Sequence, residues 1–474
     1  MTASTPSANY CSRDLREWLN HLSATDRLAV AKPGLGLKHE LAAVSQTLER
    51  DKAALFPAPD GHPVPVVSNL LTSRRWIGDC LGVAEDRVIS RYRDAVHHPL
   101  PWVEVDDGPV QAVVHKEVDI TAQLPVPTHN ELDSGPYIAA GLMISRNPAN
   151  GIQNVSIHRC QISGKDRIGV LLLPRHTWTY AQMAHENGQA LEVAIVIGVD
   201  PASLLASQAV VPLDFDEMEI AGALHGKPVE MVKCKTNNVR VPARAEIVLE
   251  GRVLADVAEP EGPFGEFPQY YGRRANRHVI QVDAITHRTA PIFHTIVGGG
   301  MEHLLLGGLP REATLLETLQ RNEPTVLDVH LSRGGICRYH LVVKVDKKQE
   351  GTPKNIMMGA FAGHYDIKQV IVVDRDVNIH DPEQVEWAVA TRFQADRDLL
   401  VVNNTQGSKL DPTTTEGGVG AKMGLDATIP LAADEFTFTV IRVPGAGDID
   451  LDIVLDDPGA AAAIIGDTDL GSET

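Results

Sequence analysis

The 474-residue chain has few cysteines, a deficit of positive charge and no long hydrophobic run. Its five cysteines are odd in number and form no CxxC pair, which favours a reduced compartment over a disulfide framework. The formal net charge of −19 argues against nucleic acid and anionic membrane surfaces as partners. Because no apolar run could span a bilayer and the polar first residues lack a signal peptide, we expect a cytoplasmic protein.

Common catalytic signatures are missing as well. The sequence contains no GxSxG elbow, no Walker loop and no HExxH. Gly298-Gly299-Gly300 lacks the GxGxxG spacing of a dinucleotide-binding fold. What is present is 43% hydrophobic residues in a chain too long for one ordinary core, so we expect two or three domains.

Apolar periodicity divides the chain. Four residues at helical spacing predict an amphipathic first helix: Leu15, Trp18, Leu19 and Leu22. From Val118 to Ala284, strand-length apolar runs separated by turn residues predict a strand-rich domain or barrel, with one helix between Trp178 and Asn187. Later strands and helices alternate, with helices starting at Thr352-Pro353 and Asp381-Pro382.

These patterns predict four segments. They are an N-terminal α/β domain (1–115), a strand-rich domain (116–300), a linker helix (301–322) and a C-terminal α/β domain (323–474). Within the linker helix, Pro310 and two glycines are expected to break the helix and weaken the alignment of His303 with Arg311. Ala460 to Ile465 could form a short docking helix or a frayed tail.

The chain is organised around Glu261-Gly262-Pro263-Phe264-Gly265-Glu266. Its glycines and proline disfavour a helix, so we expect a tight loop after a strand from Ala245 to Leu254. A rigid loop with two acids can place a proton donor beside a reacting atom, while the other acid or a nearby cation tunes it. The alternative is a turn with two solvated glutamates.

A second stretch, Asn154-Val155-Ser156-Ile157-His158-Arg159, alternates polar and apolar residues with the period of a strand. Asn154, Ser156 and His158 share one face. Arg159 lies on the opposite, otherwise apolar face, so a buried Arg159 needs a carboxylate or phosphate partner.

Together these stretches resemble the UbiD-like decarboxylases, which use prenylated FMN. The N-x-S-I-x-R and E-G-P-F-G-E motifs of that family are both intact, and the likeness runs from about Asp14 to about Ala432. It also includes Leu124 to His129, Gly135-Pro136-Tyr137 and Pro174-Arg175-His176. The resemblance implies an α/β (α+β) fold in which the central domain is a flavin-binding split β-barrel and the C-terminal domain contributes oligomer contacts.

The resemblance also implies site residues. Glu266 would donate a proton to the carbon that lost CO₂, supported by an Arg159–Glu261 ion pair, and Arg159 could also meet the substrate carboxylate. The implied cofactor-binding residues are Asn154, Ser156, Ile157, Arg159, Arg175, His176, Glu217 and Lys422. Lys422 would reach a phosphate from its glycine-rich stretch; a solvated loop lysine is the alternative.

Two metal ions are implied by the same family. Mn²⁺ would be held by Asn154, His176 and Glu217, a donor set that suits it, and would bridge the cofactor phosphate. Asp214, Asp216 and Glu219 are nearby acids, so the position of the carboxylate ligand stays open. A K⁺ site is implied near Ala206 and Ser207, sharing Glu217.

His303 and Arg311 lie eight residues apart, so both can face one side of a helix. The sequence around them resembles the furandicarboxylate-type branch of the family. Both side chains would then clamp a second polar group of a heteroaromatic acid, including a diacid such as furan-2,5-dicarboxylate; pyrrole-, phenazine- and polyketide-type acids stay open. The alternative is that Arg311 lies in a surface network with Glu312 or Glu317.

The resemblance therefore predicts a reversible, non-oxidative decarboxylase of a heteroaromatic, aromatic or α,β-unsaturated carboxylic acid. Its cofactor would come from a flavin prenyltransferase, and we expect a homodimer or larger homo-oligomer. Three other functions stay open: a cofactor-maturation paralogue, a flavin-binding or assembly protein without turnover, and a metal-dependent hydrolase that uses the Asn/His/Glu set.

Overall fold

The computed structural model describes residues 12–434, 436–446 and 448–455. One compact unit ends at Thr428, and a second unit begins at Ile429 and contains the short helix α12 (Leu451–Val454). Cys11 and the helix expected at Ala460 to Ile465 lie outside the described residues. None of the described helices is long and apolar enough to cross a membrane.

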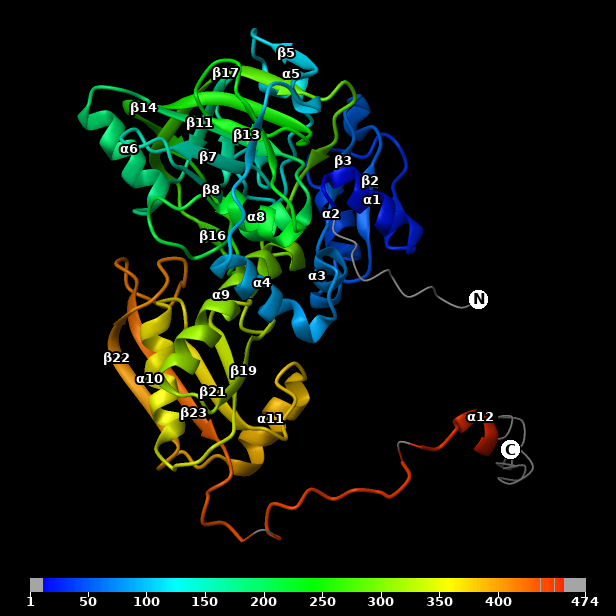
Figure 1. Ribbon diagram of the computed structural model, residues 1–474, viewed down its shortest axis with the longest axis vertical. Helices are drawn as coiled ribbons and strands as arrows, with labels where there is room; N and C mark the ends of the chain where they lie inside the picture. Colours follow the sequence, from blue (N-terminus) through cyan, green and yellow to red (C-terminus); the bar gives the residue numbers. More distant parts are fainter. Residues whose placement is uncertain (1–11, 435, 447, 456–474) are drawn as a thin grey trace, which may run out of the picture. The chain divides into compact units, whose positions relative to one another are not determined.

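The N-terminal part joins helices to a small sheet of order β1-β2-β3-β18 (Figure 1). The predicted amphipathic helix is confirmed as α1, whose four apolar residues are buried and whose N-cap Asp14 accepts the Glu17 amide. The elements are α1 (Leu15–Ala24), β1 (Leu28–Val30), α2 (Glu40–Leu48), β2 (Ala53–Phe56), β3 (Val66–Ser68), α3 (Arg74–Leu81), α4 (Val88–His97) and β18 (Phe293–His294).

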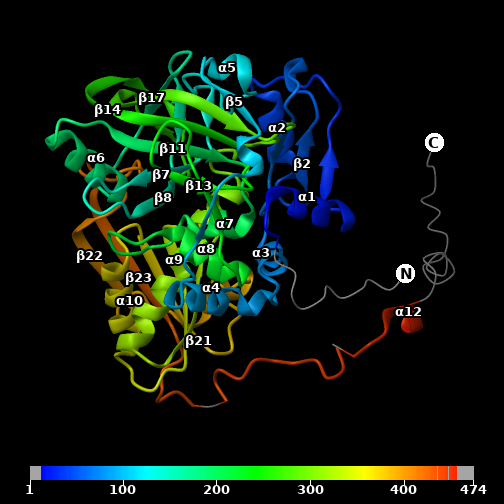
Figure 2. The same ribbon diagram turned by 45° about the horizontal axis from the view of Figure 1, so that its top comes forward.

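The central part is a curled nine-stranded sheet of order β6-β9-β10-β17-β14-β11-β7-β8, with β5 paired to β17 (Figures 1 and 2). The expected α/β fold with a split-barrel centre is confirmed. The strands are β5 (Val113–His115), β6 (Tyr137–Ile138), β7 (Leu142–Arg146), β8 (Gln153–Ile157), β9 (Cys160–Ile162), β10 (Arg167–Val170), β11 (Leu191–Ile197), β14 (Ile247–Glu261) and β17 (Ala275–His287).

Strand β14 is longer than the sequence predicts. It continues beyond Leu254 to Glu261, because β17 pairs with it as far as Glu261 opposite Ala275. The next residues form β15 (Phe264–Gly265), which pairs with β16 (Tyr271–Gly272). The segment expected to be a tight loop is therefore the end of β14 followed by the β15–β16 hairpin.

Smaller elements surround this sheet. They are β4 (Val103–Val105), α5 (Ile120–Gln123), α6 (His176–Glu186), α7 (Pro201–Ala206), α8 (Glu217–His225), β12 (Glu230–Lys233) and β13 (Arg240–Pro242). The helix predicted between Trp178 and Asn187 is confirmed as α6, which packs against β7, β11 and β14.

Helix α9 (Met301–Asn322) is continuous through Pro310 and both glycines, so the expectation that they break it was wrong. An internal proline costs about 3 kcal/mol of helix stability. Leu304, Leu309 and Leu315 are among the many residues that α9 buries against neighbouring elements, and this tertiary packing outweighs the intrinsic penalty.

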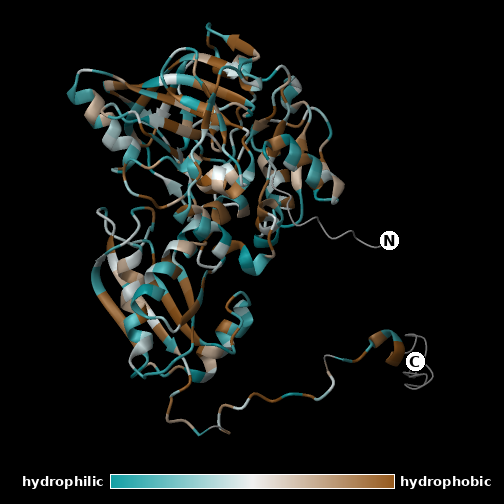
Figure 3. Ribbon diagram, viewed as in Figure 1, coloured by the Kyte–Doolittle hydropathy of each residue, from teal (hydrophilic) through white to brown (hydrophobic). Residues whose placement is uncertain are grey.

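The C-terminal sheet has the order β19-β20-β21-β23-β22. The helix start at Asp381 is confirmed because its carboxylate accepts the Glu383 amide, whereas α10 is capped by Gly351 and not by Thr352. Most of these strands are brown, that is apolar, in Figure 3. The elements are β19 (Val326–Leu331), β20 (His340–Val345), α10 (Thr352–Gly363), β21 (Gln369–Asp374), α11 (Pro382–Arg392), β22 (Leu399–Gln406) and β23 (Val419–Ala427).

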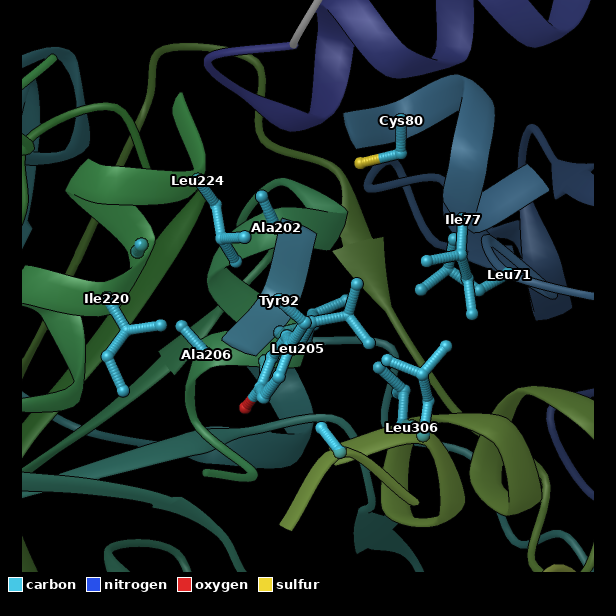
Figure 4. Close-up of a cluster of buried hydrophobic side chains, with 14 of the residues drawn as sticks. Leu71, Ile77, Cys80, Tyr92, Ala202, Leu205, Ala206, Ile220, Leu224 and Leu306 are labelled. Atoms are coloured by element: carbon cyan, nitrogen blue, oxygen red, sulfur yellow. The ribbon is translucent and has the colours of Figure 1, made fainter. Parts of the chain in front are cut away.

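A buried cluster joins helices α3, α4, α7, α8 and α9, as Figure 4 shows. Tyr92 of α4 is buried there and donates its hydroxyl to the Leu205 carbonyl of α7 at 3.2 Å. Leu306 of α9 and Ile220 of α8 belong to the same cluster. Helix α8 packs against α4, α7 and β8, and this packing positions its first residue, Glu217.

Candidate active site

Arg159 binds both acids of the Glu261–Glu266 motif. Its Nη2 donates to Glu261 Oε2 at 2.6 Å, and its Nη1 donates to Glu266 Oε1. The side chains of Arg159, Glu261 and Glu266 are 8%, 0% and 12% exposed. The structure therefore brings these three predicted residues together, and the alternative of two solvated glutamates was wrong.

Three separate backbone segments make this contact. Arg159 lies between β8 and β9, Glu261 ends β14, and Glu266 follows β15. The guanidinium carbon lies 5.5 Å from the centre of the Phe264 ring. A Cβ at Gly272 would lie 2.7 Å from Arg159 Nη1, so a larger residue here would displace the guanidinium that binds the two acids.

The two acids differ in their surroundings. Burial raises the pKa of Glu266, opposed by Arg159, while the negative charges of Glu261 and Asp133 raise it further. The pKa of Arg159 is raised, because its two carboxylates outweigh the effect of burial. Glu266 can thus keep a proton at a pH where an exposed glutamate would be ionised, beside a permanent positive charge.

Tyr137, Gln161 and Asp133 also contact the acid motif, and the sequence did not point to them as site residues. The Tyr137 hydroxyl donates to Glu261 Oε1 at 3.0 Å. Gln161 Oε1 accepts the Gly262 amide at 3.0 Å, and Asp133 accepts the Gly265 amide at 2.8 Å. The only available signal was Tyr137 in the Gly-Pro-Tyr part of the family resemblance.

Two of the three predicted metal ligands, Asn154 and His176, are in contact, and the third, Glu217, is bonded to the backbone next to Asn154. Asn154 Oδ1 is 3.0 Å from His176 Nδ1, and Glu217 Oε2 accepts the amide of Val155, the residue next to Asn154. Burial raises the pKa of Glu217 well above its usual value. In the described ranges Glu217 accepts the Val155 amide and forms no salt bridge, so a divalent cation bound here would be the counter-charge of its ionised form. The donor set fits Mn²⁺.

The acids next to Glu217 have other partners. Asp214 accepts Asn147 Nδ2 at 2.6 Å and the Tyr180 hydroxyl at 3.0 Å. Asp216 caps α8 and accepts Trp102 Nε1 at 2.9 Å, while burial raises its pKa to about 6. Of these three carboxylates, only that of Glu217 is bonded to the backbone of β8.

The remaining predicted cofactor and K⁺ residues occupy the same region. Ser156 Oγ is 2.9 Å from Nε2 of His158, whose pKa burial lowers to about 4. Ile157 ends β8. Ala206 ends α7, and Ser207 directly after it donates to the Leu204 carbonyl at 2.7 Å.

Arg175 and Lys422 converge on Tyr365, between α10 and β21. Arg175 Nη2 donates to the Tyr365 hydroxyl at 2.6 Å. Lys422 Nζ donates to the Tyr365 and Ile367 carbonyls at 2.9 and 2.8 Å, and burial lowers its pKa to about 8. Lys422 is 4% exposed, so the alternative of a solvated loop lysine was wrong.

His303 and Arg311 are both half-buried on α9. Burial, with the charges of Arg338 and Arg311, lowers the pKa of His303 to about 3. Its Nδ1 accepts the Gly299 amide at 3.2 Å, which leaves Nε2 as the protonated nitrogen. Arg311 donates to His364 Nε2 at 3.2 Å and to the Gly307 carbonyl.

The proposed surface network for Arg311 was wrong, because both candidate acids have other partners. Glu312 binds Arg74 and is 2.9 Å from His330. Glu317 is 3.0 Å from His97 and 3.2 Å from Arg321. Neither Glu312 nor Glu317 therefore neutralises Arg311, and the carboxylate whose charge acts on it is that of Asp366.

Arg338 is a further cation that the sequence did not reveal. It is 5% exposed, donates to the Leu304 carbonyl at 3.2 Å and lies 5.3 Å from the centre of the Phe267 ring. Burial, with the charge of Arg311, lowers its pKa to about 9. Phe267 directly follows Glu266, so Arg338 and the acid motif border one region.

Four positive charges act together on His364 and, with burial, lower its pKa to about 3. They belong to Arg175, Arg311, Arg338 and Lys422, which we call the cation cluster. The four positive charges of this cluster exceed the single negative charge of the buried Asp366 carboxylate. That carboxylate acts on Arg311, Arg338 and Lys422. The cation cluster suits a ligand with more than one negative charge.

Comparison with known proteins shows the family of the chain. Models of the N-terminal, Rift-related and C-terminal domains of 3-octaprenyl-4-hydroxybenzoate carboxy-lyase match residues 19–96, 102–301 and 304–427. The chain therefore belongs to the UbiD family of flavin-dependent decarboxylases, as the sequence motifs predicted. Anhydromevalonate phosphate decarboxylase of Methanothermobacter thermautotrophicus is 38% identical over 421 residues, 89% of this chain and 98% of that protein.

Solved structures extend the similarity. The UbiD-class enzyme HmfF from Pelotomaculum thermopropionicum, in complex with FMN, matches with a TM-score of 0.91 and 46% identity over 93% of this chain and all of that chain. An evolved dimeric form of HmfF, in complex with prFMN, matches with a TM-score of 0.87 and 44% identity over 94% of this chain and all of that chain.

Proposed function

We propose that this protein is a reversible, non-oxidative decarboxylase that uses prenylated FMN and acts on a heteroaromatic, aromatic or α,β-unsaturated carboxylic acid. The observation that carries the proposal is the buried Glu261–Arg159–Glu266 arrangement, in which one arginine binds two carboxyl groups of unequal environment. The FMN and prFMN complexes of HmfF support the cofactor assignment.

Glu266 would protonate the substrate carbon. The bond between this carbon and the carboxylate breaks, CO₂ leaves, and the electron pair of that bond forms the new C–H bond when Glu266 delivers its proton. Arg159 can orient the departing carboxylate and stabilises the Glu266 anion that remains. In the reverse direction, ionised Glu266 accepts the proton. Prenylated FMN, when bound, supplies the electron sink for the charge left by CO₂.

Several residues would hold the cofactor. Asn154, His176 and Glu217 would bind Mn²⁺ at its phosphate, and Ala206 and Ser207 would contribute to a K⁺ site. Ser156, Ile157 and Arg175 would line the cofactor. Lys422 already uses its ammonium on two carbonyls, so it would act on a phosphate through its charge and its remaining N–H.

His303 and Arg311 would bind a second acidic group of the substrate, and Arg338 adds to their charge. A carboxylate of a heteroaromatic diacid fits this arrangement, in line with the resemblance to the furandicarboxylate-type branch. A phosphate fits it as well, and the name of the archaeal relatives includes a phosphate-bearing acid. Both classes therefore belong in a substrate screen.

The test begins with protein produced together with a flavin prenyltransferase. The mass and absorbance spectrum of its cofactor identify prenylated FMN, and CO₂ release is measured on a panel that includes furan-2,5-dicarboxylate, furan-2-carboxylate and a phosphorylated α,β-unsaturated acid. Glu266→Gln should bind the cofactor but lower kcat about 10²-fold or more and stop exchange of the product hydrogen with D₂O.

Two results would contradict this function. Full turnover by flavin-free protein would favour a metal-dependent hydrolase. Bound flavin without CO₂ release from any acid on the panel would favour a flavin-binding or assembly protein. Near-normal hydrogen exchange in Glu266→Gln would leave the decarboxylase class intact but move the donor, with Glu261 the next candidate.

A further inference from the structure

The two acids of the site have different hydrogen-bond donors. Both Glu261 oxygens are occupied, Oε1 by the Tyr137 hydroxyl at 3.0 Å and Oε2 by Arg159 at 2.6 Å. Arg159 is the only described side chain that donates to the Glu266 carboxyl. Two carboxyls that share one guanidinium and are largely removed from water tend to share one proton, so their other donors decide where it resides.

The position of Tyr137 is tightly fixed. Its side chain is fully buried on β6, and its ring lies 4.4 Å from that of Phe264, between the two acids in sequence. Burial raises the pKa of Tyr137, so its hydroxyl remains a donor. Ser134 Oγ lies 3.1 Å from this hydroxyl.

The single Tyr137 proton has three acceptors within reach, and Ser134 Oγ, 3.1 Å away, can instead donate its own proton to Tyr137. Gln161 Oε1 is 3.2 Å away but already accepts the Gly262 amide, whereas Glu261 Oε1 is closer. A carboxylate is also the stronger acceptor of the two. The Tyr137 proton therefore goes to Glu261.

We propose that Tyr137 is a positioning residue that holds Glu261 as the carboxylate, so that the proton shared by the two acids resides on Glu266. This inference rests on the proposed role of Glu266 as the proton donor. Tyr137 acts through Glu261, since its hydroxyl is directed at that carboxylate. Without this hydroxyl, buried Glu261 loses one of its two donors and competes for the proton, and Glu266 becomes the ionised partner of Arg159.

The other groups around the acids do not create this difference. Arg159 binds both carboxyls. Asp133 adds negative charge near Glu266, and the buried Cys160 thiol has a pKa raised by burial and by Glu261, so it stays neutral. Of these neighbours, Tyr137 is the one neutral group that donates a hydrogen bond to Glu261 and not to Glu266.

Tyr137→Phe tests the inference because it removes one oxygen and keeps the ring against Phe264. Neutron crystallography of the deuterated protein without cofactor locates the shared deuteron directly. We expect it on Glu266 in the parent protein and on Glu261 in Tyr137→Phe. A deuteron that stays on Glu266 in the variant overturns the proposal.

The pH dependence of product-hydrogen exchange in the loaded enzyme, measured with the acid of the panel that turns over fastest, is the second readout. Its alkaline limb should move down by about 1–2 pH units in Tyr137→Phe, the shift that corresponds to one hydrogen bond to a charged group. A merely structural defect would lower the rate equally at all pH values, and that result also contradicts the proposal. Ser134→Ala, which keeps the bond from Tyr137 to Glu261, should retain the parent profile.

These outcomes are separable from those for the proposed function. If Glu266→Gln retains product-hydrogen exchange, Glu266 is not the donor. The deuteron positions in the parent protein and in Tyr137→Phe would still show whether Tyr137 controls the location of the shared proton.

Discussion

The guanidinium of Arg338 occupies the space that a side chain at Gly307 would need. Gly307 lies inside α9, where glycine is less favourable than alanine by about 1 kcal/mol, so its presence reflects this close approach. The same helix carries His303 and Arg311 on either side of Gly307. The position of Arg338 in the cation cluster therefore depends on the absence of a side chain at Gly307.

Gly307→Ala should displace Arg338 while α9 still forms. We expect a higher KM for a substrate with two acidic groups, by about tenfold or more, because one charge-assisted contact is lost. Steady-state kinetics with a diacid and its monoacid analogue measure this effect. Gly359→Ala in α10 is a matched control, since its new Cβ would meet only the flexible end of Leu319. Equal KM changes in both variants would contradict the role of Arg338.

Arg311→Ala tests the substrate clamp. It should weaken binding of a diacid by about 1.5–3 kcal/mol and leave the monoacid analogue nearly unaffected, because only the diacid has the second carboxylate. Arg321→Ala, on the same helix but 73% exposed and paired with Glu317, is the control. Equal loss on both acids, or no loss, would rule out the clamp.

Removal of the metal should weaken flavin binding. If Glu217 helps to hold a divalent cation at the cofactor phosphate, EDTA should raise the Kd for FMN by about tenfold or more in the parent protein. Glu217→Gln should bind FMN weakly with or without EDTA, and Glu219→Gln should behave like the parent. Fluorescence titration measures the Kd for FMN in all three proteins. If EDTA still raises this Kd in Glu217→Gln, the metal is bound by other residues.

The raised pKa of Glu266 sets the direction of the pH dependence. Decarboxylation needs the protonated acid, so kcat should fall as the pH rises through this pKa; the reverse reaction needs the ionised form and should show the opposite dependence. Rates of CO₂ release and of isotopic CO₂ exchange over a pH series measure the two limbs. Glu259→Gln, which removes an acid bonded to Arg167 at 2.9 Å, should leave both unchanged.

The acid motif could be predicted because its residues are contiguous and their chemistry is local. Arg159 could be given a carboxylate partner in advance, since an arginine on an apolar strand face requires one. Arg338 could not be found in this way, because its role depends on a chain reversal that brings it against α9 from outside the helix. In this reversal Ile336 and Cys337 both have positive φ angles. Residues of these types rarely adopt this conformation, so the sequence does not predict the reversal.

The interpretation of α9 failed for a related reason. Local propensity made its glycines and Pro310 look like breakers, but tertiary packing decides the helix and Gly307 accommodates Arg338. A pair of glycines within a leucine-rich helix was in fact the available signal for a close contact. Tyr137 gave less warning, since a buried tyrosine is an ordinary core residue until its hydroxyl partner is known.

The cation cluster has a kinetic consequence in a chain whose formal charge is −19. An anionic substrate is repelled by the molecule as a whole and attracted only within about one Debye length, ~8 Å at physiological ionic strength, of the four cations. Added salt screens the distant repulsion before it weakens the contacts inside the site. The rate of encounter with a dianion should therefore rise with salt at low ionic strength, opposite to the behaviour of enzymes that steer their substrates by long-range attraction.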